Sequence, residues 1–308
     1  GVGCFIGPNF VGALAYADDI VLIAPTPTAL RRLLSICENY ARDYCISFNS
    51  LKTKCLVIIP RERRELSAHV ENLVFFIDDK PISIVKSFSH LGHLINSDLS
   101  DDDDIIKQRN IFIGQTNNNL CYFKNLHSYI QYKLFHSYCT NFYGCELWQL
   151  FNPTIESFCV AWRKGLRRIW KLPYNTHCSL LPVVSQCLPI FDELCRRFLN
   201  FARSCVTHEC PLIRFIANNG IVHSRSLSPI GQNVLYCLNR YNCTFNSFLC
   251  DSVNRIINCY YSNSIEDSTF CTANLLIELI SVRDGICEIA IDLNKEELQF
   301  IIDNVCTS

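Results

Sequence analysis

Two adjacent carboxylates inside a strongly apolar stretch constrain this chain more than any other feature. Residues 10–24 read FVGALAYADDIVLIA, so Asp18 and Asp19 separate two short runs of alanine, valine, leucine and isoleucine. Short apolar runs on either side of a polar pair are typical of two strands joined by a tight turn. An unpartnered carboxylate is costly to bury. The pair is therefore expected either at a solvated turn or at a cation.

Both interpretations of Asp18 and Asp19 are open at this point. The first is an ordinary solvated turn. The second is a divalent-metal site at the tip of a hairpin, because Mg²⁺ prefers oxygen ligands and often takes only one or two carboxylates from a protein. Two such ions about 4 Å apart can hold the attacking and leaving oxygens during phosphoryl transfer.

A helix is expected after the acidic hairpin. Pro25 and Pro27 end the second apolar run. The helix then begins either with Thr28 as its N-cap or with Thr26 as the N-cap and Pro27 in the first turn. Apolar residues at helical spacing mark the face that this helix buries, namely Leu30, Leu33, Leu34, Cys37 and Ala41.

More strands are expected before residue 97. Residues 54–59 (KCLVII) are typical of a buried strand, and residues 72–96 predict a strand, a turn and two further strands. The first turn of this region is Asp78-Asp79-Lys80-Pro81. The last strand is expected to run from Phe88 to Ile95, with Gly92 inside it.

The rest of the chain predicts helices almost throughout. The change comes at residues 101–104, a run of four aspartates that suits the positive end of a helix dipole. The fold class is therefore α+β, with a small antiparallel sheet and a helix followed by a mostly α-helical region. The expected helices lie near 103–125, 128–145, 154–171, 188–206, 229–240, 246–262, 270–282 and 295–305.

The segment ALAYADDIVLIA, followed by a proline break and a helix with Arg31-Arg32, resembles the polymerase palm of reverse transcriptases. It is most similar to the non-LTR, LINE-type retrotransposon branch. Further matches follow in order over residues 1 to about 205, although His90 stands where the family usually has tyrosine. They are Phe48-Asn49, Leu51-Lys52-Thr53-Lys54, Ser89-His90-Leu91-Gly92, Phe142-Tyr143-Gly144, Leu147-Trp148, Trp162–Trp170, Leu172-Pro173 and Thr176-His177.

The resemblance implies an RNA-directed DNA polymerase that extends a primer 3′-hydroxyl on an RNA template with deoxynucleoside triphosphates and Mg²⁺. It implies that Asp18 and Asp19 bind metal, that Tyr16 lies under the primer end and that Lys52 acts near the triphosphate; an ordinary surface lysine is the alternative for Lys52. His90, Leu91 and Gly92 would belong to a hairpin that grips the primer. The implied domains are the C-terminal part of a palm (1–97), a helical thumb-like region (98–185) and a helical extension (186–308).

One part of the family's active site has no counterpart here. The family uses a third aspartate from an upstream strand and a fingers domain, yet only fifteen residues precede Tyr16 and none of them is acidic. The chain also contains no methionine. We therefore expect a fragment whose partner is the N-terminal part of the same polyprotein, and which is inactive alone. The alternative is a degenerate or co-opted remnant that binds nucleic acid or other partners without catalysis.

A basic stripe is expected on the helix at 154–171. The net charge of the chain is only −1, so a nucleic-acid surface requires local clustering of this kind. The alternative is a solvated basic face, and the tryptophans of this helix are assigned to the core rather than to base stacking. The stripe consists of Arg163, Lys164, Arg167, Arg168 and Lys171.

The twenty cysteines, about 6% of the chain, do not reach the roughly 8–10% of a disulfide scaffold. The sequence has neither a secretory signal nor an apolar run of membrane-spanning length, so we expect reduced thiols in the cytoplasm or nucleus, no secretion and no membrane partner. Cys205, His208 and Cys210 carry zinc-binding side chains but lack a clear fourth ligand. Small buried hydrophobes are the favoured role for the scattered cysteines.

Overall fold

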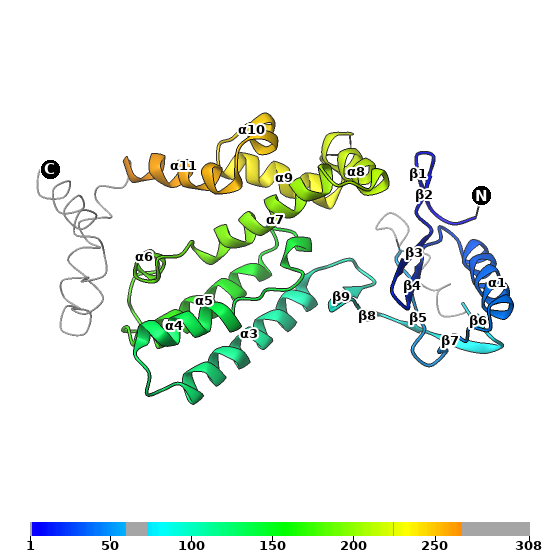
Figure 1. The fold of residues 1–308 in the computed structure, drawn as a ribbon, viewed down its shortest axis with the longest axis horizontal. Coiled ribbons are helices and arrows are strands. Elements are labelled where there is room, and N and C mark those ends of the chain that lie inside the picture. Colours follow the sequence, from blue (N-terminus) through cyan, green and yellow to red (C-terminus); the bar gives the residue numbers. More distant parts are fainter. Residues whose placement is uncertain (1, 60–72, 224, 267–308) are drawn as a thin grey trace, which may run out of the picture. The chain divides into compact units, whose positions relative to one another are not determined.

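The computed structural model describes residues 2–59, 73–223 and 225–266, and it confirms the predicted α+β class (Figure 1). The chain divides into two compact units. The first comprises residues 1–104 with 210–212, and the second comprises residues 105–209 with 213–308. The described strands all belong to the first unit, and the second is built from helices.

The acidic pair lies at the turn of a two-stranded antiparallel hairpin, as predicted. Strand β3 (Ala13–Tyr16) pairs with β4 (Asp19–Leu22) so that Tyr16 is opposite Asp19. Only Ala17 and Asp18 connect the strands, and Ala17 has a left-handed φ of +52°. A shorter hairpin precedes it, formed by β1 (Phe5–Ile6) and β2 (Asn9–Phe10).

Helix α1 (Pro27–Asp43) covers a three-stranded sheet in the first unit. Of the two predicted starts, the structure has Thr26 as the N-cap, whose Oγ1 accepts a hydrogen bond of 3.2 Å from the Ala29 amide. This sheet was predicted to be antiparallel, but it is mixed. Its strand order is β5-β7-β6, with β5 (Lys54–Leu56) parallel to β7 (Lys80–Val85) and β6 (Phe75–Ile77) antiparallel to it. The core between helix and sheet contains Leu34, Cys55, Phe75, Ile77 and Ile82.

The turn predicted at Asp78 is confirmed, and the last predicted strand is corrected. Asp78 and Asp79 have φ values of +48° and +56°, which makes a two-residue turn between β6 and β7. The single strand expected over 88–95 is wrong. It is a hairpin of β8 (Ser87–His90) and β9 (His93–Asn96) that turns at Leu91 and Gly92, because both residues adopt left-handed φ values of +47° and +82°.

The described elements from residue 102 onward are helices. Two of the α-helices, α6 and α8, and both short segments η2 and η3 were not predicted. The α-helices are α3 (Asp102–Tyr122), α4 (Ser128–Tyr138), α5 (Thr154–Ile169), α6 (Leu180–Ser185), α7 (Ile190–Val206), α8 (Pro211–Asn218), α9 (Pro229–Arg240), α10 (Phe245–Cys250) and α11 (Val253–Glu266), with a 3₁₀ turn η2 (Cys145–Leu147) and a π-helical segment η3 (Asn219–His223).

Two of the predicted helices have wrong bounds. The helix expected over 128–145 ends at Tyr138, because Thr140 Oγ1 bonds the His136 carbonyl (2.6 Å) and Gly144 has a φ of +81°. The helix expected over 246–262 is two helices. Asp251 is extended after α10, and the Ser252 hydroxyl accepts a bond from the Arg255 amide (3.2 Å) in the first turn of α11. The helices predicted at 270–282 and 295–305 lie outside the described residues.

The helical unit has a continuous hydrophobic core that extends along the chain from Ile105 to Ile257. All three tryptophans belong to it, which confirms their predicted role, and Trp148 is completely buried. The predicted division at residue 185 stays a prediction. Among the residues that the structure describes, no helix combines the length and apolar character needed to cross a membrane.

Two buried polar side chains connect segments that are far apart in this unit. Asp192 Oδ1 accepts hydrogen bonds from Arg240 Nε (3.0 Å), Arg240 Nη2 (2.9 Å) and the Tyr241 hydroxyl (2.7 Å), and its Oδ2 accepts one from the Tyr261 hydroxyl. Asn233 accepts from the Leu150 amide (2.9 Å) and donates to the Trp148 carbonyl (2.8 Å). The side chains of Asp192 and Asn233 are buried and fully hydrogen-bonded, as is usual for polar groups inside proteins. We therefore assign both residues a role in holding the fold together.

Candidate polymerase and nucleic-acid sites

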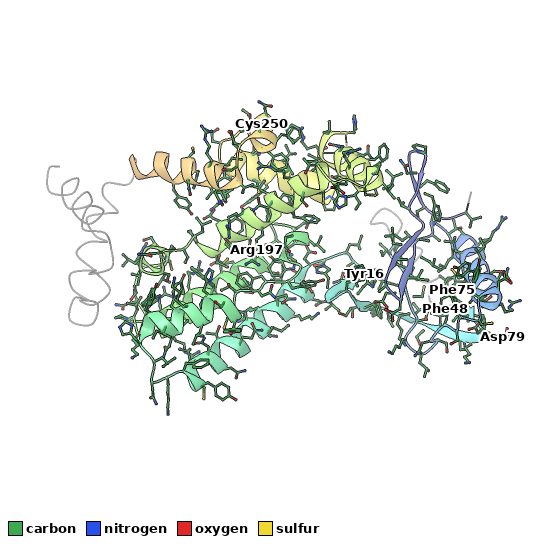
Figure 2. The ribbon with its side chains drawn as sticks, viewed as in Figure 1. Tyr16, Phe48, Phe75, Asp79, Arg197 and Cys250 are labelled. Carbon is green, nitrogen blue, oxygen red and sulfur yellow. The ribbon has the colours of Figure 1, made fainter. Side chains whose placement is uncertain are left out.

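The tip of the β3–β4 hairpin presents Tyr16, Asp18 and Asp19 to solvent. Tyr16 is 67% exposed and both aspartates are exposed, as Figure 2 shows for Tyr16 on the hairpin. A left-handed conformation costs a residue other than glycine about 1–2 kcal/mol, so Ala17 makes this a strained turn. Such strain gathers at functional sites.

The described residues do not complete a metal site around the acidic pair. No group of three or more His, Cys, Asp or Glu side chains is placed to hold a metal ion in the part of the chain that the structure describes. Asp18 and Asp19 therefore fit two ligands of a magnesium site and not the whole of one. The zinc alternative gains no support, since Cys205, His208 and Cys210 form no such group in the described residues.

Lys52 lies on an exposed turn that Asn49 organises. The Asn49 side-chain oxygen accepts hydrogen bonds from the Leu51 and Lys52 amides, both of 3.1 Å, and Thr53 Oγ1 donates to the Asn49 carbonyl (2.9 Å). An asparagine that bonds the amide two residues on is a common way to build such a turn. The exposed Lys52 ammonium forms no ion pair with Asp18 or Asp19 among the described residues.

The turn at Leu91 and Gly92 is held at its base by an aspartate that the sequence did not single out. His90 is paired across the hairpin with His93, whose Nδ1 lies 3.1 Å from Asp104 Oδ2. Asp104 Oδ1 accepts a bond from the Leu94 amide (2.9 Å), and the Asp104 side chain is completely buried. The aspartate run was predicted only as a helix start, but Asp104 also fixes strand β9.

The five basic residues of the predicted stripe lie on or directly after α5, and three of them have partners. Arg163 pairs with Glu156, and Arg168 Nη1 donates to Asn117 Oδ1 (2.6 Å). Arg167 donates to the Thr176 carbonyl from Nε (3.2 Å) and Nη2 (2.8 Å), which holds the turn after the helix. Lys164, Arg168 and Lys171 are the exposed members of the stripe.

The buried cysteines of the helical unit are not activated nucleophiles. Cys139, Cys145, Cys159, Cys195 and Cys237 are buried in the core, as expected for small hydrophobes. Burial raises the pKa of Cys139 to about 11 and that of Cys159 to about 12. A thiol nucleophile needs the opposite shift.

No family model, no curated protein and no solved structure matches this chain. The resemblance to non-LTR reverse transcriptases therefore rests on the quoted residues and their order.

Proposed function

We propose that this chain forms the C-terminal part of the palm and a thumb-like region of a non-LTR, LINE-type reverse transcriptase. RNA template, DNA primer and deoxynucleoside triphosphates are then its ligands. The N-terminal part of the same polyprotein supplies the fingers and the third aspartate. The observation that carries the proposal is the exposure of Asp18 and Asp19 at a two-residue hairpin turn, ahead of a helix that packs on a sheet.

The chain alone carries out no chemical step. Asp18 and Asp19 supply two carboxylates toward Mg²⁺, and no third His, Cys, Asp or Glu joins them in the described residues. Two-metal nucleotidyl transfer needs both ions held in one geometry. The contribution of this chain is therefore to provide part of a metal site and to bind nucleic acid.

We predict that residues 1–308 alone will not extend a DNA primer on an RNA template in Mg²⁺ and deoxynucleoside triphosphates. The reason is the incomplete ligand set at Asp18 and Asp19. Denaturing gel electrophoresis of a labelled primer measures the extension.

A second acidic hairpin turn in the same unit supplies the control. Asp78 and Asp79 are exposed and lie at the turn between β6 and β7. Asparagine tolerates such turn conformations, so Asp78→Asn with Asp79→Asn should keep the fold. The prediction is contradicted if the wild-type chain extends the primer, Asp18→Asn with Asp19→Asn abolishes the extension and the control variant retains it. Such a result would show that no upstream ligand is needed.

The basic stripe supports the nucleic-acid part of the proposal. Of its exposed members, Lys164 and Arg168 lie four residues apart on one side of α5, and Lys171 follows the end of the helix. Each phosphate that a lysine or arginine neutralises releases condensed counterions. Because Arg167 is bonded to the Thr176 carbonyl, its replacement would also disturb the fold.

Replacing Lys164, Arg168 and Lys171 together by glutamine should weaken binding to an RNA–DNA duplex and flatten its salt dependence. The slope of log affinity against log salt should fall by about two to three units, at about 0.7–0.9 per lost phosphate contact. Fluorescence anisotropy of a labelled duplex at several salt concentrations measures it.

The matched control removes the same charge elsewhere. Arg32, Lys86 and Lys124 are exposed and lie outside α5, and glutamine removes their charge while keeping a polar side chain. The control should leave the slope unchanged. Equal slopes for wild type and the stripe variant would identify the stripe as a solvated face.

A further inference from the structure

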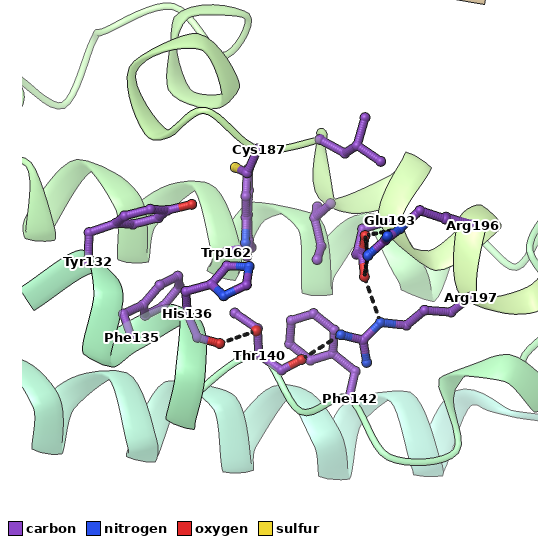
Figure 3. A pocket seen from close by; sticks show the side chains of 12 residues that line it. Tyr132, Phe135, His136, Thr140, Phe142, Trp162, Cys187, Glu193, Arg196 and Arg197 are labelled. Carbon is purple, nitrogen blue, oxygen red and sulfur yellow. Dashed lines mark hydrogen bonds and ion pairs between the residues drawn. The ribbon is translucent and has the colours of Figure 1, made fainter. Parts of the chain in front are cut away.

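The pocket between α4, α5 and α7, which Trp162 lines, is too small for a nucleotide. Its volume is about 110 Å³, whereas a cavity of about 150 Å³ holds a single benzene ring. Its charged side chains are also engaged (Figure 3). Glu193 accepts hydrogen bonds from Arg196 Nε (2.7 Å) and Arg197 Nε (2.8 Å), and Arg197 Nη2 donates to the Thr140 carbonyl (2.9 Å). Any base that this unit binds must therefore lie at its surface.

The chain around the C-terminal end of α5 has a local excess of positive charge. Residues 157–191 contain three arginines and two lysines but no aspartate or glutamate, although the net charge of the whole chain is −1. Of these five basic residues, Arg163 is the one that forms an ion pair within the described residues, with Glu156. The remaining positive charge at this end of α5 is available for a polyanion.

A tight turn at residues 173–176 follows α5, and Arg167 holds it. The Thr176 amide and the Thr176 hydroxyl both donate to the Pro173 carbonyl, at 3.1 and 2.8 Å. Arg167 donates to the Thr176 carbonyl from Nε and Nη2, and Nη2 also contacts Cys178 Sγ at 3.4 Å. No carboxylate neutralises the Arg167 guanidinium among the described residues. Its positive charge therefore lies in the turn itself.

The turn displays the ring of Tyr174. The side chain is 80% exposed, and within the described part of the chain it contacts no other aromatic ring and forms no hydrogen bond. Pro173 restricts the backbone directly before it. A tyrosine loses little conformational entropy on binding, because it has only two side-chain torsions. An exposed ring on an ordered turn beside positive charge is how proteins bind unpaired nucleotides.

We propose that the end of α5 binds single-stranded nucleic acid, with one base stacked on the Tyr174 ring and the adjoining phosphates at Arg168 and Lys171. Both basic residues are exposed and precede Tyr174 by six and three positions. An unpaired base has a free face for the ring, whereas the bases of a duplex are already stacked on one another. The inference rests on the nucleic-acid part of the proposed function and names an unpaired strand as the ligand at this end of the helix.

Fluorescence anisotropy of a labelled oligouridylate of about 12 nucleotides, within the usual range of single-strand sites, tests the proposal. Tyr174→Ala in the full chain should weaken the affinity about 5- to 100-fold, because it removes one stacking contact. The salt dependence should be unchanged, because the ring neutralises no phosphate. Tyr174→Phe keeps the ring and should bind like the wild type. An affinity that Tyr174→Ala leaves unchanged would overturn the proposal.

Tyr143→Ala is the matched control. Tyr143 is 55% exposed and follows Phe142, whose ring contacts Phe158 near the start of α5, so it lies at the opposite end of this helix. Its replacement should leave the affinity unchanged, and circular dichroism should show that every variant is folded. An equal loss of affinity in Tyr143→Ala and Tyr174→Ala would overturn the proposal.

An RNA–DNA duplex separates this inference from the proposed function. Tyr174→Ala should not change the affinity for the duplex, and a loss as large as for the single strand would overturn the assignment to an unpaired base. If the glutamine variant of the stripe flattens the salt dependence but Tyr174→Ala has no effect on either ligand, the inference is wrong and the nucleic-acid function stands. If the wild-type chain binds neither ligand, both are wrong.

Discussion

Replacing Asp192 by asparagine will lower the free energy of unfolding of the helical unit by about 3–5 kcal/mol. Asp192 is 1% exposed and accepts hydrogen bonds from Arg240, Tyr241 and Tyr261. Asparagine keeps the size of the side chain but leaves the partly buried Arg240 guanidinium without its counter-charge. Removing one partner of a buried ion pair is costly for this reason.

Urea denaturation followed by circular dichroism at neutral pH measures the loss. The same substitution at Asp251 is the control, because Asp251 forms an exposed pair with Arg255 on the surface of the same unit. Exposed pairs contribute about 0.2–1 kcal/mol, so Asp251→Asn should change little. If both variants lose the same stability, Asp192 does not hold α7, α9 and α11 together.

Raising the pH from 8 to 10 will destabilise the helical unit, and two of its buried thiols, Cys139 and Cys159, will contribute about 3 kcal/mol to the loss. The folded pKa values of Cys139 and Cys159, about 11 and 12, lie above the ordinary thiol value because of burial. Above pH 8.5–9, roughly the unfolded thiol pKa, the unfolded chain loses protons that the folded chain keeps. Stability is therefore fully present below that pH and is lost as the pH rises toward the folded values. Each thiol contributes about 1.4 kcal/mol per pH unit in this window.

Unfolding midpoints in urea at pH 8 and pH 10 measure this effect. The double variant Cys139→Ala with Cys159→Ala should lose about 3 kcal/mol of the pH dependence, whatever its stability at pH 8. Cys121→Ala with Cys259→Ala is the control, since both thiols are exposed. A pH dependence that is equal in the two double variants would show that other groups cause it.

The elements that were predicted correctly are those determined by residues close together in the sequence. The β3–β4 hairpin follows from two apolar runs around an acidic pair, and the start of α1 follows from Thr26 and Pro27. The Asp78 turn is likewise determined by neighbouring residues. Caps and tight turns involve residues only a few positions apart, so a single sequence contains all of their determinants.

Non-local partners explain what the sequence could not predict. The parallel pairing of β5 with β7 brings Lys54 opposite Ser83. The sequence predicted Asp104 only as an acidic residue at the start of a helix, but in the structure it also pairs with His93 and accepts a hydrogen bond from the Leu94 amide. The pocket beside Trp162 joins side chains of three helices, and no spacing within one helix indicates it. In the basic stripe the charges were predictable, but the partners that occupy Arg163, Arg167 and Arg168 were not.

The bonds of Asn233 to Trp148 and Leu150 determine an order of assembly. They join residues 83 and 85 positions apart, so these two bonds can form only after α9 has been synthesised. During synthesis at about 5–20 residues per second, that interval is roughly 4–17 s. A nascent chain that ends near residue 185 would lack both bonds from Asn233 to Trp148 and Leu150. The helical unit should therefore become resistant to protease late, once α9 has left the ribosome.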